Sequence, residues 1–154
     1  MKLEKCQYYF ETELNAPIEA CFNAFVDQEV MKKWIPDVKD IIYDHSAAEA
    51  PYHAGSVRDI VMSNGMVIQE RITDYSPPNY CAYNIDSMGA IADKLFSNYH
   101  GLVTFDAIGD NKTKFTWQGN FDCNGLQKIM QPLTRWMICK AIQKMLGNIE
   151  AHFS

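Results

Sequence analysis

The sequence predicts an α+β fold in which one curved antiparallel sheet of about seven strands wraps around a long C-terminal helix. Three observations lead to this prediction. Short segments with alternating apolar and polar residues, separated by turn signals, fill most of residues 6–14 and 38–122. Two short helical segments lie between the first strand and the others, within residues 15–34. Residues 125–153 have the apolar spacing of a single long helix.

The first strand and the two short helices occupy residues 6–34. Residues 6–14 alternate, which is typical of a strand with one apolar face. In the helix that follows, Asn15 is the expected cap and Pro17 lies near the first turn. A second helix over residues 27–34 is expected to end before Pro36, because proline disfavours helical backbone at the residue that precedes it.

Strands account for most of residues 38–122. The segment 38–46 is one strand, and residues 55–75 read as a hairpin folded about Asn64-Gly65. A proline-containing turn at 74–80 leads into a strand over 80–86. Residues 86–95 are ambiguous and fit either a mobile rim or a simple connection. Two further strands, 96–107 and 113–122, are joined by a hairpin turn at 108–112.

The C-terminal segment 125–153 is the only predicted element long enough to cover the apolar face of the sheet. Pro132 is awkward inside a helix, so the main helix either begins there or bends there. A curved sheet around a helix generally leaves a void at one end. The residues that form the apolar stripe of this helix are Leu133, Met137, Ile138, Ala141, Ile142, Met145, Ile149 and Phe153.

The composition excludes several classes of protein. The chain has 154 residues, and we expect a single domain over residues 1–154. A net charge of −5 without a basic patch argues against nucleic-acid binding. The N-terminus does not read as a signal peptide, and no apolar run approaches the roughly eighteen residues of a membrane span. We therefore expect a cytoplasmic protein, monomeric or homodimeric, without an integral membrane segment.

The five cysteines and four histidines show no metal-ligand spacing, and the cysteines form no CxxC pair. We expect reduced thiols and no metal site. The sequence also contains no phosphate-binding loop or dinucleotide motif, so no cofactor is expected. His100 falls on the strand face opposite Tyr99 and is expected to point outward.

Two charges lie in the middle of the apolar hairpin, Arg58 on its first strand and Glu70 on its second. A two-residue turn would place Asp59 opposite Glu70, which sets like charges against each other. A turn of three residues, 63–65, instead places Arg58 opposite Glu70 and Met62 opposite Met66. Gly65 suits the left-handed position of such a turn, so the second register is predicted.

The predicted register implies an Arg58–Glu70 ion pair on the more apolar side of the hairpin. A lone buried charge is very costly, whereas a paired and hydrogen-bonded charge is tolerated. The pair has two interpretations. It can be a structural device that fixes strand register, or a polar anchor that orients the carbonyl, hydroxyl or carboxylate of a ligand in an apolar pocket.

The order of elements resembles the helix-grip fold of the START-like superfamily, which includes birch-pollen-allergen-like proteins and lipid-transfer domains. The resemblance covers nearly the whole chain and is carried by "LNAPIEACFNAF", "HAGSVRDI" and "ERITDYSPPNYCAY". The last two segments are similar to the polyketide cyclase/dehydrase-like branch, in which G-x-x-R is followed by E-R-hydrophobic and a proline-rich turn. The resemblance implies a cavity between the sheet and the C-terminal helix.

Plant abscisic acid receptors share this sequence grammar, including an Asn-Tyr pair like Asn98-Tyr99. By position, Glu70 matches a pocket glutamate of those receptors. Met62, Tyr83, Ile85 and Tyr99 match positions that line their ligand cavity. The gate loop of the receptors is replaced here by the short turn "SNGM", so hormone binding is not implied.

The leading interpretation is a protein that binds or transports a small hydrophobic or amphipathic ligand, such as a lipid, a polyketide-like aromatic or an isoprenoid. One alternative is a cyclase or dehydratase with Glu70 as base, Arg58 stabilising an enolate and Tyr83 assisting. Another is a protein-partner module of the same fold.

Gly101 and Gly119 mark places where a ligand or the helix can come close. Methionines 62, 66, 88, 130 and 137 are candidates for an adaptable lining. The residues expected to contact the ligand are Arg58, Ile60, Met62, Ile68, Glu70, Tyr83, Ile85, Tyr99, Trp117, Leu133 and Met137.

Overall fold

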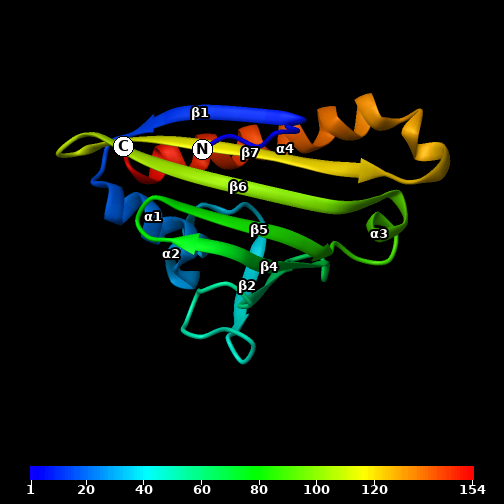
Figure 1. Cartoon of the computed structure of the whole chain (residues 1–154), viewed down its shortest axis with the longest axis horizontal. Helices are drawn as coiled ribbons and strands as arrows, with labels where there is room; N and C mark the ends of the chain where they lie inside the picture. Colours follow the sequence, from blue (N-terminus) through cyan, green and yellow to red (C-terminus); the bar gives the residue numbers. More distant parts are fainter.

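The computed structural model describes the backbone of residues 1–154 and every side chain except those of residues 126 and 127. Within it, seven strands form one antiparallel sheet in the order β1-β7-β6-β5-β4-β3-β2, as expected for the α+β prediction (Figure 1). The elements in chain order are β1 (Tyr8–Leu14), α1 (Ile18–Val26), α2 (Gln28–Trp34), β2 (Val38–Asp44), β3 (Val57–Met62), β4 (Val67–Ser76), β5 (Tyr80–Ser87), α3 (Ala92–Leu95), β6 (Phe96–Gly109), β7 (Lys112–Cys123) and α4 (Gln131–His152).

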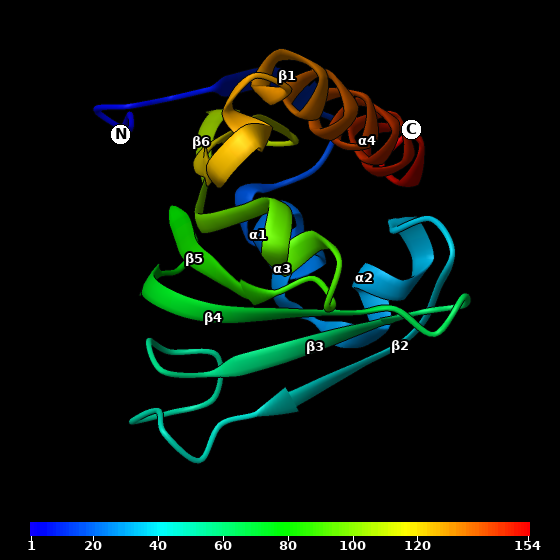
Figure 2. The same cartoon turned by 90° about the vertical axis from the view of Figure 1, so that its right-hand side faces the viewer.

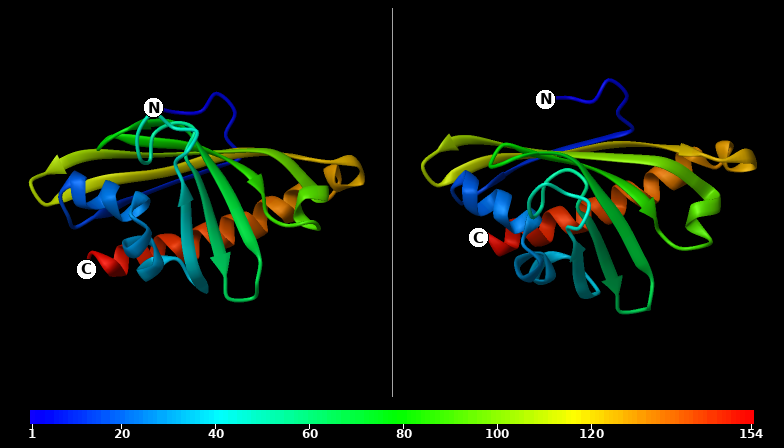
Figure 3. Two further views of the ribbon diagram at one scale, coloured as in Figure 1. Left: turned by 90° about the horizontal axis from the view of Figure 1, so that it is seen from below. Right: turned by 60° about the horizontal axis from the view of Figure 1, so that its bottom comes forward.

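The sheet bends around the helices. In Figure 2, α4 lies on one side of α1 and α2, and strands β2 to β4 lie on the other. Helix α1 contacts β6 and β7, whereas α2 contacts β2 and α4, so the two short helices fill one end of the curve. Figure 3 shows α4 running along the sheet with β2 to β5 curving away beside it. This arrangement is the helix-grip architecture.

The two short helices begin and end for different reasons. Helix α1 starts after Pro17, and no side chain caps it, so the expected cap at Asn15 is wrong. Helix α2 is capped by Asp27, whose carboxylate accepts hydrogen bonds from the backbone N–H of Glu29 at 2.9 Å and of Val30 at 3.0 Å. It ends at Trp34, before the Ile35-Pro36 pair, as predicted.

Two uncertain segments of the sequence take definite form in the structure. The ambiguous residues 86–95 contain the single-turn helix α3 before β6 begins. The C-terminal helix α4 starts at Gln131 with Pro132 in its first turn, so it begins at the proline rather than bending there. A separate 3₁₀ turn, Gly125–Lys128, precedes it, and the main helix is therefore shorter than the predicted 125–153. None of the helices that the structure describes is long and apolar enough to span a bilayer.

An aromatic cluster forms the core between α1, α2 and the centre of the sheet. The Phe25 ring lies 5.4 Å from the Trp117 ring, nearly perpendicular to it, and 6.0 Å from the Trp34 ring. Phe105 and Phe115 pack against the same phenylalanine from β6 and β7. Edge-to-face packing of this kind adds stability beyond the area that is buried. The cluster packs the two short helices against the centre of the sheet.

Two strand glycines make room for tyrosine rings. A side chain at Gly101 would overlap the Tyr83 ring, and one at Gly119 would overlap the Tyr8 ring and approach the backbone of His100. The close approach predicted at these glycines therefore exists. Its partners, however, are tyrosines of the neighbouring strands rather than the helix.

Candidate functional site

The β3–β4 hairpin has the register that its charges predict. Arg58 lies opposite Glu70, and the backbone N–H of Met62 donates to the carbonyl of Met66 at 2.8 Å. Residues 63–65 thus form the turn, and Gly65 adopts a φ of 86°, a left-handed conformation that glycine tolerates best. The three-residue turn is confirmed, and it brings both charged side chains to the inner face of the sheet.

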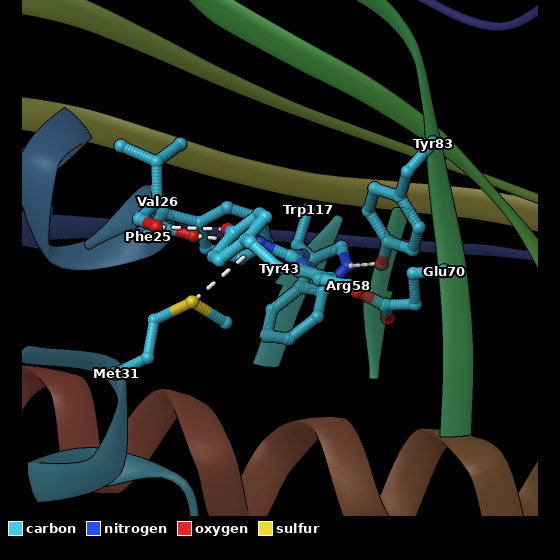
Figure 4. Close-up of polar contacts among 8 residues, drawn as sticks. All are labelled: Phe25, Val26, Met31, Tyr43, Arg58, Glu70, Tyr83 and Trp117. Atoms are coloured by element: carbon cyan, nitrogen blue, oxygen red, sulfur yellow. Dashed lines mark hydrogen bonds and ion pairs between the residues drawn. The ribbon is translucent and has the colours of Figure 1, made fainter. Parts of the chain in front are cut away.

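The Arg58 side chain is 1% exposed and lies at the centre of a buried network (Figure 4). Its Nε donates to the Glu70 carboxylate. Its Nη1 donates to the backbone carbonyl of Phe25 at 2.9 Å and to the Tyr43 hydroxyl at 3.3 Å. The guanidinium also lies over the rings of Phe25, at 5.1 Å, and Tyr83, at 5.6 Å. The network joins β3 to β4 and to the end of α1.

Arg58 acts as a cationic cap on helix α1. Phe25 is in the last turn of that helix, where backbone carbonyls lack helical partners and the dipole favours a positive charge. The Tyr43 hydroxyl extends the same connection, because it accepts from Arg58 and donates to the Val26 carbonyl at 2.8 Å. Burial is the largest single influence on the pKa of the guanidinium and lowers it, but the charge of Glu70 and the hydroxyl of Tyr43 together outweigh burial and raise the pKa. Arg58 therefore stays protonated in the core.

Glu70 presents one carboxylate oxygen to the interior space. Its Oε2 binds Arg58, and no residue that the structure describes hydrogen-bonds its Oε1. In the described part of the chain every fully buried side-chain nitrogen and oxygen has a partner, so the unpartnered Oε1 is not fully buried, although the Glu70 side chain is only 8% exposed. The carboxylate is thus held by one oxygen and available through the other.

Three buried tyrosine hydroxyls lie on or behind this wall. Trp117 donates its indole N–H to the Tyr83 hydroxyl at 2.9 Å, and no described residue accepts the proton of that hydroxyl. The hydroxyls of Tyr8 and Tyr99 share a hydrogen bond of 2.6 Å. Tyr83 can therefore donate a hydrogen bond in the same cavity in which the Glu70 carboxylate can accept one (Figure 4).

The buried tyrosines should make the fold sensitive to alkali. Burial is the main cause that raises the pKa of Tyr8, Tyr83 and Tyr99 above the usual value. Because these hydroxyls ionise more easily in the unfolded chain, stability is retained below about pH 10 and falls as the pH rises further. Each tyrosine contributes up to about 1.4 kcal/mol per pH unit. Exposed tyrosines such as Tyr9 ionise in the folded protein, so we expect an early rise in tyrosinate absorbance without a change in circular dichroism. The absorbance of the buried tyrosines should appear only with the loss of circular dichroism, and the stability of Tyr8→Phe should depend less steeply on pH. Ionisation of the buried tyrosines before unfolding would contradict the prediction.

A cavity of about 310 Å³ lies between the inner face of β3–β6, helix α2 and helix α4. Nine of the eleven residues expected at the site line this cavity. They are Arg58, Ile60, Met62, Ile68, Glu70, Tyr83, Ile85, Tyr99 and Trp117. Their strands contribute alternate residues, so the period of two in the sequence was sufficient to place them on one wall.

The other two expected residues, Leu133 and Met137, do not line the cavity and are exposed to solvent. The buried face of α4 is centred on Ile142, with Leu146 and Ile149. At about 100° per residue, Leu133 lies roughly 180° from Ile142 and Met137 roughly 140°. The helix instead lines the cavity with Ile138, Ala141, Ile142, Lys144 and Met145.

Helices α1 and α2 contribute side chains to the lining that were not among the expected site residues. Phe25, Met31, Trp34 and Ile35 line the cavity from these helices and the residue after α2. Helical spacing alone identifies these residues as apolar, but it cannot distinguish core from cavity wall. Of the methionines expected in the lining, Met62, Met66 and Met88 are present, whereas Met130 and Met137 are at the surface.

Other reactive side chains are poorly placed for chemistry in this cavity. Burial raises the pKa of the Cys81 thiol to about 12, which keeps it protonated and unreactive. His100 is not in the cavity lining, and its Nδ1 lies 2.7 Å from the Asn84 amide oxygen. The described residues contain no group of His, Cys, Asp and Glu placed to hold a metal ion. Glu70 and Tyr83 are therefore the groups best placed to contact a ligand.

Comparison with known proteins agrees with this architecture. Residues 5–154 match the model of a family described as polyketide cyclase / dehydrase and lipid transport. No curated protein sequence matches the chain. Among solved structures, a START superfamily protein from Mycobacterium smegmatis superposes with a TM-score of 0.72 at 10% identity, covering 95% of each chain. The protein XoxI from Bacillus cereus gives 0.71 at 15% identity, covering 95% of this chain and 94% of its own.

A plant enzyme has the same fold. Truncated norcoclaurine synthase from Thalictrum flavum superposes with a TM-score of 0.68 at 12% identity, covering 95% of this chain and 91% of its own. Identities this low show the helix-grip fold and leave the ligand open. The family match spans almost all of the sequence and includes every residue of the cavity wall. The chain belongs to the polyketide cyclase / dehydrase and lipid transport family.

Proposed function

We propose that this protein binds a small hydrophobic or amphipathic molecule between the sheet and α4 and transports it. The observation that carries the proposal is the cavity itself. It is apolar over most of its wall and offers one carboxylate oxygen and one tyrosine hydroxyl for a polar group. Ligand pockets combine these features, with an apolar lining and a few polar groups that fix orientation. The family and the fold support a ligand-binding domain in general.

The size and lining of the cavity favour a compact ligand. A volume of about 310 Å³ is near the lower end of the usual range for small-molecule pockets. A small ring system or a single short chain, from a polyketide-like aromatic, an isoprenoid or a lipid, fits this range better than a two-chain lipid. Flexible thioether side chains adapt to such molecules. Five methionines line the cavity, namely Met31, Met62, Met66, Met88 and Met145.

The polar groups favour a ligand with a neutral hydroxyl. Oε1 of Glu70 accepts a hydrogen bond, and the Tyr83 hydroxyl can donate one. The charge of Glu70 is already balanced by Arg58, so an ionised group placed beside them would bring an unbalanced charge into a buried apolar space. Lys144 also lines the cavity, but its side chain is 63% exposed, so it can pair only with a charge near the solvent side. A hydroxyl group satisfies both partners without adding charge.

A cyclase- or dehydratase-type reaction is the second candidate, and the available Glu70 oxygen favours it. Glu70 would remove a proton and Tyr83 would stabilise the developing oxyanion. Arg58 is less suited to the role expected for it, because its hydrogen bonds go to Glu70, Phe25 and Tyr43. Turnover of a polyketide-like substrate that depends on Glu70 would favour the enzyme over the carrier.

Native mass spectrometry of protein purified from cells tests the proposed binding. We expect a bound species of a few hundred daltons, which solvent extraction would identify. Met62→Trp fills the cavity and should abolish this species, whereas Met137→Trp makes the same change on the exposed side of α4 and should retain it. If the wild-type protein stays empty after incubation with a cell lipid extract, or if Met62→Trp binds equally well, the proposed binding is wrong.

A further inference from the structure

Apolar side chains gather on the surface where α4 begins. Ile129, Met130, Leu133, Trp136 and Met137 form this group, which we call the α4 patch. Ile129 is 79% exposed and Trp136 57% exposed. Isolated apolar residues are normal on a protein surface, but a contiguous group of large ones usually marks an interaction site.

The α4 patch is separate from the cavity and from the core. Leu133, Trp136 and Met137 are spaced by three and four residues, so they share one face of the helix. This face is opposite Ile142, which packs inward. The first turns of α4 lie at the same end of the molecule as α3, which faces the viewer in Figure 2 and lies at the right in Figure 1. Ile91, which directly precedes α3, is also 79% exposed.

The same segment concentrates positive charge in an acidic protein. Residues 123–149 contain Lys128, Arg135, Lys140 and Lys144 and no acidic residue. The remaining residues carry ten basic and nineteen acidic side chains. Lys140 and Lys144 continue the face of Leu133 and Trp136 along the helix, and the Lys140 ammonium lies 5.8 Å from the centre of the Trp136 ring. Apolar and basic side chains thus form one continuous surface.

We propose that the α4 patch docks the protein onto an anionic lipid bilayer. Trp, Leu, Met and Ile flanked by Lys and Arg are typical of helices that lie in the membrane interface. Negatively charged headgroups would complement Lys140 and Lys144, which lie on the same face of α4 as Leu133 and Trp136. Lys144 would exchange a long contact of 3.9 Å with the Asp37 carboxylate for a headgroup. Arg135 lies on another side of the helix, roughly 160° from Leu133. A second copy of the chain fits less well, because a two-fold contact between α4 patches would bring the same positive charges together.

Docking would also bring the bilayer close to the cavity. Met137 belongs to the α4 patch, and Ile138, the next residue, lines the cavity. Lys144 lies on the basic part of the same surface and also lines the cavity. If the proposed binding function holds, a ligand could pass between bilayer and cavity near this part of α4. The docking itself does not depend on that function.

Tryptophan fluorescence gives a direct test. The protein has three tryptophans, and Trp136 is the exposed one that a docked bilayer would contact. Trp34 and Trp117 are buried in the cavity wall, so a shift that persists in Trp136→Phe would report a molecule in the cavity instead of docking. Vesicles of phosphatidylcholine with phosphatidylglycerol should shift its emission to the blue, and pure phosphatidylcholine should shift it less. Trp136→Phe should remove the shift but still co-sediment with anionic vesicles. Lys140→Gln should weaken binding about fivefold, and added salt should weaken it further.

A paired substitution on the α4 patch provides the decisive comparison. Leu133→Glu with Met137→Glu should abolish co-sedimentation without changing thermal unfolding, because both side chains are exposed. Ile108→Glu is the matched control, since Ile108 is exposed at the end of β6, in the hairpin at the opposite end of the molecule (Figure 1). Its vesicle binding should be unchanged.

Three results would overturn the docking proposal. The first is that the wild-type protein does not bind anionic vesicles. The second is that Ile108→Glu loses as much vesicle binding as the paired variant. The third is that the protein forms a concentration-dependent dimer, which the paired substitution abolishes, and that vesicles do not change its tryptophan emission. The last result would assign the α4 patch to self-association. Native mass spectrometry of the paired variant separates this test from the proposed binding, because a cargo in the cavity should remain when docking is lost.

Discussion

Replacing Arg58 by methionine is expected to lower the free energy of unfolding by about 3–5 kcal/mol. The substitution leaves the buried Glu70 carboxylate without its counter-charge. It also removes the cation that caps helix α1 through the Phe25 carbonyl. Methionine has a similar length and adapts to apolar surroundings, so loss of packing contributes little. Urea unfolding followed by circular dichroism measures the difference.

The double variant Arg58→Met with Glu70→Met separates the charge effect from the packing effect. With both charges gone, most of the lost stability should return, because well-packed apolar residues replace buried ion pairs at little net cost. A residual loss of about 1–3 kcal/mol is expected from the unpaired Phe25 carbonyl. A double variant as unstable as Arg58→Met would show that the ion pair is not the source of the effect. If Arg58→Met alone keeps nearly wild-type stability, water must reach the Glu70 carboxylate and replace Arg58 as its partner.

The Arg58–Glu70 pair also shows why part of this site could be predicted from sequence. Two adjacent strands with a tight turn allow few registers, and the like charges of Asp59 and Glu70 exclude one of them. The strand alternation then assigns every side chain of the hairpin to a face. For the same reason the expected succession of strands along the chain and the nine strand residues of the cavity agree with the structure.

Contacts between distant segments could not be predicted in this way. The bond from Arg58 to Phe25 spans 33 residues, and the bond between Tyr8 and Tyr99 spans 91. The rotation of α4 depends on its packing against α2 and β1, which no local pattern specifies. Leu133 and Met137 are apolar although they do not pack in the core. The apolar periodicity of α4 therefore led to the wrong prediction that they line the cavity.

Changing Glu70 to glutamine is expected to alter ligand selectivity rather than to abolish binding. The prediction uses two probes that differ by one hydroxyl, 1-naphthol and naphthalene. The wild-type protein should prefer 1-naphthol, because its hydroxyl can donate to Oε1 of Glu70 and accept from Tyr83. A hydrogen bond to a charged group is stronger than one to a neutral group, so Glu70→Gln should reduce the preference about tenfold. Fluorescence titration at neutral pH gives both dissociation constants.

The ratio of the two dissociation constants distinguishes the two roles of the ion pair. Met62→Leu is the matched control, since it alters the apolar wall for both probes and should leave their ratio unchanged. Glu70→Gln will also lose stability, because glutamine cannot balance the charge of Arg58. If Glu70→Gln proves too unstable to titrate, Glu70→Asp keeps the charge and moves the carboxylate away from the cavity, and it should also reduce the preference. An unchanged ratio in a folded but less stable variant would mean that Glu70 only holds the strands and α1 together. A weaker preference for 1-naphthol over naphthalene would mean that the Glu70 carboxylate both neutralises the buried Arg58 and selects the ligand.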